Sequence, residues 1–200
     1  MSRHARNKAA GAAWMLALLL WHLPPAAGAG DTQPREYLDP ETAATVTVVG
    51  DPLVFDNPRT EVAANARDYV TVAAAAVNRS GKVSYVLVAY FWSTVDPRMR
   101  TDPLPNPEPL IVLADDRRIE LTLRGHSAHD AGIGVAVLPP PGPAVTPNVY
   151  SIDLGALRSI AESRHLSLLT QTASTSIPYG LWDDRRAALR SFVQHMSGPG

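Results

Sequence analysis

Hydrophobic and polar residues alternate with a period of two over much of the chain after residue 44, which is the pattern of β-strands with one buried face. Two long runs, 68–77 (DYVTVAAAAV) and 82–94 (KVSYVLVAYFWST), are rich in β-branched and aromatic residues and are joined by the short link 78–81 (NRSG). A short polar link that ends in glycine predicts a β-hairpin. Both alternating faces of the second run are apolar, so we expect a central strand that is covered on both sides.

Shorter segments complete this pattern. The period of two predicts further strands at 44–49, 52–55, 110–113, 118–124, 132–138, 149–154 and 166–172. Apolar spacing of three and four predicts a short helix at 154–161 and a stronger helix that begins at Asp183 and Asp184. The sequence therefore predicts a mostly β fold, an antiparallel sandwich or an open barrel with one or two short C-terminal helices, with an α+β arrangement as the alternative.

The N-terminal residues follow a different pattern. Three basic residues precede an apolar run from Ala9 to Trp21, and a proline pair and the small residues 27–29 (AGA) follow it. That order is typical of a secretory signal peptide with cleavage after Ala29. The apolar run has about 13 residues, fewer than the roughly 20 that cross a bilayer as a helix. The alternative is an uncleaved segment that tethers the protein to a membrane, the one case in which we expect a membrane contact.

The chain divides into three parts. We expect a signal peptide at 1–29, an extended lead-in at 30–43 and a single β-rich domain at 44–197.

Composition and charge limit the kinds of protein that this chain can be. Three of the 18 basic residues and none of the 19 acidic residues lie before residue 30, so the mature chain has a net charge of −4. This charge argues against a nucleic-acid partner. The absence of cysteine excludes disulfides, thiolate metal sites and a catalytic thiol. Arginine far outnumbers lysine, and alanine and proline are frequent, which favours a bacterial protein that is periplasmic or secreted.

One segment suggests metal chemistry. His126, His129 and Asp130 place two imidazoles and a carboxylate within five residues, after an expected strand. Such ligands suit zinc or another divalent metal, so a metal-binding protein or a metal-dependent hydrolase is one hypothesis. The spacing is not that of a metalloprotease helix, and a solvated loop is the simpler interpretation. Apart from this metal, no cofactor is predicted, and no Gly-x-Ser-x-Gly or Ser-x-x-Lys motif indicates a catalytic serine.

Several aromatic and arginine residues are candidates for binding a partner. Trp182 lies beside Arg185 and Arg186 in the segment 179–186 (YGLWDDRR), and tryptophan and arginine often anchor protein interfaces. The alternative is a capped helix start whose tryptophan packs on the sheet. Tyr37, in the lead-in, is a further candidate contact. The aromatic residues of the run 82–94 suit either a groove for a sugar or peptide, or the core, and a doubly covered strand favours the core.

The segments 36–55, NRSG, YFWST and LWDDRRAAL together resemble a group of small proteobacterial envelope proteins that carry signal peptides. The resemblance covers most of the mature chain and implies export, and it brings no activity and no site residue with it. The sequence as a whole favours an exported, non-enzymatic β-domain that acts by binding an envelope protein or peptide, as an accessory to cell-envelope assembly. The metal hypothesis is the alternative.

Overall fold

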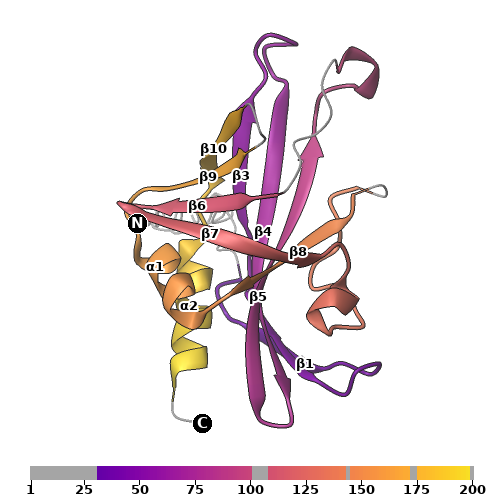
Figure 1. Ribbon diagram of the computed structural model, residues 1–200, viewed down its shortest axis with the longest axis vertical. Coiled ribbons are helices and arrows are strands. Elements are labelled where there is room, and N and C mark those ends of the chain that lie inside the picture. The colour runs from indigo at the N-terminus through magenta and orange to yellow at the C-terminus, as the bar shows by residue number, and fades with distance from the viewer. Residues whose placement is uncertain (1–30, 101–107, 143–144, 172–174, 199–200) are drawn as a thin grey trace, which may run out of the picture.

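The computed structural model describes residues 31–100, 108–142, 145–171 and 175–198 (Figure 1). The signal peptide expected at 1–29 lies outside these residues. Ten strands and two α-helices are defined in the described part of the chain. They are β1 (Arg35–Leu38), β2 (Thr45–Val48), β3 (Leu53–Pro58), β4 (Arg67–Arg79), β5 (Lys82–Ser93), β6 (Leu110–Ala114), β7 (Arg117–Gly125), β8 (Pro147–Ile152), α1 (Leu154–Glu162), β9 (Leu166–Gln171), β10 (Ser176–Asp183) and α2 (Arg186–Ser197). Two short 3₁₀ helices, η1 (Pro97–Met99) and η2 (Ala128–Ala131), lie in the connections.

Eight of the strands form a closed antiparallel barrel. Their order is β4-β3-β10-β9-β6-β7-β8-β5, and the pairing of β4 with β5 closes the ring. The expected mostly β class is confirmed, and of the two expected forms the structure has the barrel rather than the sandwich, although the barrel is closed and not open. The reason is that β5 pairs with β8 along the edge opposite to β4, so the ring contains no free edge where a second sheet would begin.

The predicted hairpin is confirmed. β4 and β5 pair without interruption from Asp68 opposite Ser93 to Arg79 opposite Lys82. Ser80 and Gly81 form the turn with φ of 50° and 83°, the positive values that a two-residue hairpin turn of this twist requires. The middle of β5 is buried on both faces, as its two apolar faces predict.

The long β4–β5 hairpin extends beyond the barrel, where β2 pairs with β4 and β1 pairs with β2 (Figure 1). The segment after η2 packs along the hairpin: its Gly132 carbonyl accepts a hydrogen bond of 2.8 Å from Arg79 near the tip, and its Leu138 carbonyl accepts one of 2.9 Å from the Tyr90 hydroxyl in the barrel part of β5. The strand expected at 132–138 is wrong, because Ile133 N–H donates to Ala128 and Gly134 N–H donates to the carboxylate of Asp39 instead of to a neighbouring strand.

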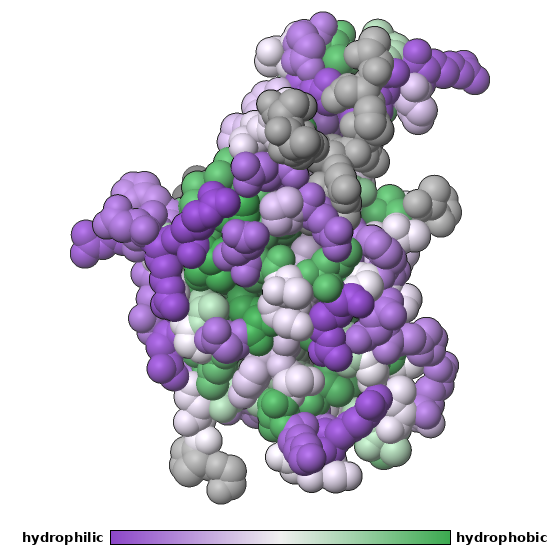
Figure 2. All heavy atoms as spheres, viewed as in Figure 1, coloured by the Kyte–Doolittle hydropathy of each residue, from purple (hydrophilic) through white to green (hydrophobic). Residues whose placement is uncertain are grey.

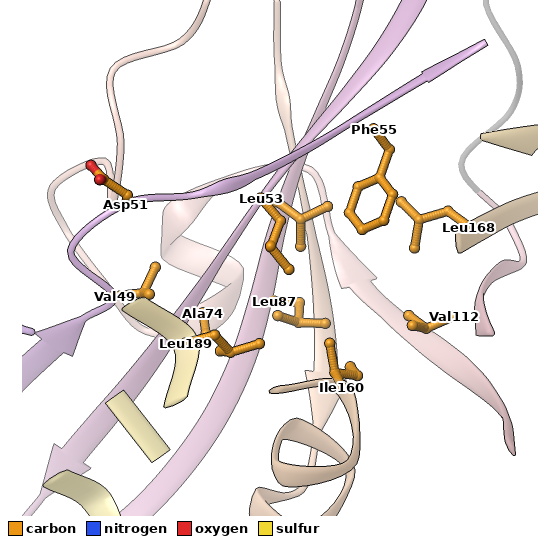
Figure 3. Close-up of a pocket in the computed structure, with 11 residues that line it drawn as sticks. Val49, Asp51, Leu53, Phe55, Ala74, Leu87, Val112, Ile160, Leu168 and Leu189 are labelled. Atoms are coloured by element: carbon orange, nitrogen blue, oxygen red, sulfur yellow. The ribbon is translucent and has the colours of Figure 1, made fainter. Parts of the chain in front are cut away.

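The two helices lie against each other and cover one end of the barrel interior. Their side chains Ile160 and Leu189 meet Leu53, Phe55 and Leu87 from the strands around a cavity of about 20 Å³ (Figure 3). That volume has room for about one water molecule, so this end of the barrel is packed. Both predicted helices are confirmed, although α2 begins at Arg186 and Asp183 still belongs to β10.

Two strands lie where none was expected. β1 falls inside the predicted lead-in, and β10 spans Ser176–Asp183, for which the sequence predicted no strand. β10 is held by pairing with β9 on one edge and β3 on the other, contacts with residues distant in sequence. In the described ranges no helix has both the length and the apolar character that crossing a membrane requires.

Candidate functional site

An aromatic cluster lies on the outer face of the barrel, across β4, β5 and β10. Tyr69 of β4 is directly opposite Trp92 of β5, and their rings stack with centroids 4.2 Å apart and planes 13° from parallel. The rings of Trp182 of β10 and Tyr69 lie in a T-shaped, edge-to-face arrangement with a centroid distance of 6.2 Å and an angle of 79°. These three rings, together with Arg67, are called the aromatic strip below.

Arg67 joins the aromatic strip to the sheet. Its guanidinium carbon lies 4.5 Å from the centroid of the Trp182 ring, which is the geometry of a cation–π contact. The same guanidinium donates from Nη1 to the carboxylate of Asp56 on β3, the strand between β4 and β10. Asp56 is only 8% exposed, so this ion pair balances a nearly buried charge. The positive charge of Arg67 is therefore neutralised, while its planar face stays against the indole.

The strand pattern explains why these side chains point outward. Phe55 and Leu53 alternate with Asp56 along β3, and both line the cavity inside the barrel. Asp56 therefore faces outward, and Tyr69, its partner in the register, faces the same way. On β10 the register shifts between Leu181 and Asp183, and this bulge carries Trp182. A bulge re-aims a side chain at the edge of regular pairing.

The aromatic strip offers a surface that suits a partner. Trp182 is 55% exposed, one of the few large apolar side chains with so much open surface in the described part of the chain. Trp92 is half-buried, and its Nε1 donates a 3.0 Å hydrogen bond to Thr71 Oγ1, which fixes the ring orientation. Large rings held rigidly in place lose little conformational entropy when a partner covers them. The strip is thus a preorganised, mainly apolar contact surface.

The structure does not bring the predicted interaction residues together. Tyr37 lies on β1, which β2, β4 and β3 separate from β10 in the sheet (Figure 1). Arg185 pairs with Asp183 at 2.9 Å. Arg186 donates to the Ser163 and Arg164 carbonyls. Its pairing with Asp184 raises the pKa of its guanidinium. Arg186 therefore fastens the start of α2 to the end of α1, and of the four candidates only Trp182 belongs to the aromatic strip.

Two of the three candidate metal ligands, His126 and Asp130, have hydrogen-bond partners in the fold, and the third, His129, is an exposed residue of η2. The imidazole Nδ1 of His126 is 2.8 Å from Asn148 Oδ1 on β8. Asp130 Oδ2 accepts from Ser127 N at 2.9 Å and from Ser127 Oγ at 2.7 Å, and these bonds lower the pKa of the carboxyl. Asp130 thus caps η2. The described ranges hold no group of three or more His, Cys, Asp or Glu side chains suited to a metal ion.

Sequence reasoning missed Arg67 and Tyr69. The signal that would have found Tyr69 is the hairpin turn, because a two-residue turn at Ser80 and Gly81 sets the whole register and places Tyr69 opposite Trp92. No comparable signal exists for Arg67 and Trp182, whose contact depends on β3 lying between β4 and β10. No family model, no curated protein and no solved structure matches this chain.

Proposed function

We propose that this chain is an exported, non-enzymatic binding module that holds a protein or peptide partner of the cell envelope through the aromatic strip. The observation that carries the proposal is the exposed Trp182, which contacts both the guanidinium of Arg67 and the ring of Tyr69. Tryptophan, tyrosine and arginine are the side chains most enriched among residues that dominate interface energies. A partner that covers the strip gains apolar burial on rings that are already immobilised.

The charge of the strip supports a protein or peptide rather than a polyanion. The only cation in the strip, Arg67, is paired with Asp56. A nucleic acid or another polyanion requires unpaired positive charge along its path, whereas a protein surface with apolar and amide groups does not. In the described residues no contact favours the metal-dependent alternative over this one, so a single function is proposed.

The experiment uses site-specific photo-crosslinking in the producing cell. A photoreactive phenylalanine analogue replaces Trp182 in one strain and Val135 in a control strain, because Val135 is also exposed (45%) but lies outside the strip. We expect one dominant adduct from position 182 and not from position 135, identified by mass spectrometry. An adduct at position 182 tests whether a partner contacts the strip. The affinity of that partner for the Trp182→Ala variant then tests how much Trp182 contributes to the binding free energy.

The affinity test compares Trp182→Ala with Val135→Ala. We expect Trp182→Ala to weaken binding of the purified partner by about 10–100-fold, the range for a dominant interface residue. Val135→Ala should leave binding unchanged. The proposal fails if position 182 yields no specific adduct, or if Trp182→Ala binds the identified partner as tightly as the unmodified protein.

A further inference from the structure

A second surface gathers positive charge at the opposite part of the long hairpin. A cleft of about 400 Å³ lies between the tip of the β4–β5 hairpin, the end of β7 and η2. Its volume is within the range of small-ligand sites in proteins. The basic side chains that line it come from three separate segments, Arg79 and Lys82 from the hairpin, Arg124 from β7 and His129 from η2. At the lower end of the molecule, where the hairpin tip lies, strongly hydrophilic side chains stand beside apolar ones (Figure 2).

The cations in this cleft are not neutralised by the described residues. Within those residues, no carboxylate forms an ion pair with Arg79, Lys82 or Arg124. Asp130 is the one carboxylate in the described lining, and its Oδ2 accepts a hydrogen bond from the Ser127 hydroxyl. Three permanent positive charges thus face one negative charge, in a chain whose formal net charge is −1. The excess is a local feature of the cleft.

One of the cations is held in place before any ligand arrives. Nη2 of Arg79 donates a 2.8 Å hydrogen bond to the Gly132 carbonyl, across the cleft from the hairpin. Gly132 has φ of 77° and no side chain, and a Cβ there would lie 2.7 Å from the same nitrogen. Glycine therefore supplies both the left-handed turn and the room for the guanidinium. The remaining N–H groups of Arg79 are the donors that a bound anion would meet.

We propose that this cleft binds the phosphate group of an anionic ligand. The net excess of about two positive charges matches a phosphate, and arginine and lysine together supply the forked and point-charge donors that phosphate groups use. Val77 and Val83 line the same cleft, and Val83 is 41% exposed, so a ligand with an apolar part beside its phosphate fits this lining. A soluble phosphate ester and the headgroup of an anionic lipid share this chemistry.

The test separates the two sources with two probes. Inorganic phosphate is titrated into ¹⁵N-labelled protein while amide shifts are followed, and flotation measures binding to vesicles of phosphatidylglycerol or of phosphatidylcholine. The variant Arg79→Gln/Lys82→Gln/Arg124→Gln is compared with Arg117→Gln/Arg118→Gln/Arg158→Gln, which removes the same charge from the β6–β7 hairpin and α1. All forms carry the same N-terminus, checked by intact mass.

We expect the cleft variant to bind inorganic phosphate or phosphatidylglycerol vesicles at least tenfold more weakly, and the control variant to bind within twofold of the unmodified protein. Amide shifts with inorganic phosphate but no binding to phosphatidylglycerol vesicles would assign a soluble ligand. Binding to the phosphatidylglycerol vesicles without amide shifts from inorganic phosphate would assign a lipid headgroup. If Arg79→Gln disturbs folding, Lys82→Gln/Arg124→Gln tests the same site, since both side chains are exposed. Equal losses in the cleft and control variants, binding of neither probe, or equal binding to phosphatidylcholine overturns the proposal.

Discussion

The guanidinium of Arg67 covers one side of the Trp182 ring at 4.5 Å and at the same time pairs with Asp56. The three residues lie on β4, β10 and the strand β3 between them, so one side chain ties together three neighbouring strands of the barrel wall. Because Asp56 is nearly buried, Arg67 is held by charge as well as by stacking. The position of the exposed tryptophan therefore depends on an ion pair beneath it.

Replacing Arg67 by methionine is expected to destabilise the fold by about 1–3 kcal/mol, because Asp56 then remains buried without its charged partner. Methionine keeps much of the apolar stem of the side chain, so the loss of stability measures the contribution of the guanidinium's charge and of its stacking on Trp182. Urea unfolding measures the change in free energy, and Trp fluorescence reports the new surroundings of Trp182. The double variant Asp56→Asn/Arg67→Met should recover part of the loss, and a double variant as unstable as the sum of both single ones would contradict the ion-pair argument.

Replacing Tyr69 by alanine is expected to cost about 1–2 kcal/mol, since it removes a half-buried ring that touches both tryptophans. Near-UV circular dichroism should lose intensity, because the stacked pair of Tyr69 and Trp92 is then broken. Tyr69→Phe keeps the ring and is the matched control, with stability and spectrum close to those of the unmodified protein. An unchanged near-UV spectrum in Tyr69→Ala would show that the stack is not formed in solution.

The sequence predicted the parts of the fold that depend on local contacts. The β4–β5 hairpin follows from its β-branched runs and its polar link, and both helices follow from apolar spacing of three and four. Each of these elements is specified by residues close together in the chain. The register of the hairpin is set in the same local way, by the turn at Ser80 and Gly81.

Closure of the barrel and β10 depend on distant contacts. Alternation shows that one face of a strand is buried, but a sandwich and a barrel bury that face equally, so pairing of β5 with β8 was not predictable from it. In β10, Pro178 and Gly180 have low strand propensity, and the pairing with β3 and β9 overrides it. The error at 132–138 is the converse, because apolar residues there are buried without strand pairing.

The candidate site residues likewise divide into those that local sequence indicates and those that depend on contacts between distant segments. Trp182 was identified because tryptophan beside arginine is a recognisable composition, but the arginine that contacts it is Arg67, not its sequence neighbours. Arg186 instead fastens two helices, a role that depends on where α1 ends. The spacing of His126, His129 and Asp130 suggested one group of ligands, yet His126 and Asp130 have separate hydrogen-bond partners in the fold.

Asp39 is expected to make the free energy of unfolding depend on pH in the acidic range. It is buried, which favours a higher pKa, but the N–H groups of Gly134 and Glu41 donate to it and together lower its pKa below the ordinary value. The folded state therefore prefers the charged form. The stability that this preference adds is fully present above the unfolded pKa of about 3.9 and is lost as the pH falls through the lower folded pKa.

The variant Asp39→Asn isolates this contribution. It cannot ionise, so the difference in unfolding free energy between it and the unmodified protein should be constant above about pH 5 and should shrink as the pH falls below about 4. Urea unfolding at a series of pH values measures this difference. Asp115 and Asp130 also have lowered pKa values and remain in both proteins, so their shared acid dependence cancels. A difference that stays constant down to pH 2 would contradict the role assigned to Asp39.

His126 and His129 are expected to respond differently to replacement by alanine. His126→Ala removes the partner of the nearly buried Asn148 and should cost about 1 kcal/mol, whereas His129→Ala should change stability by less than about 0.5 kcal/mol, because its side chain is exposed. Thermal unfolding with and without added zinc measures both effects. A melting temperature that rises with zinc in the unmodified protein, and in neither variant, would instead favour the metal-dependent alternative, since a shared ligand set makes the two histidines equally necessary.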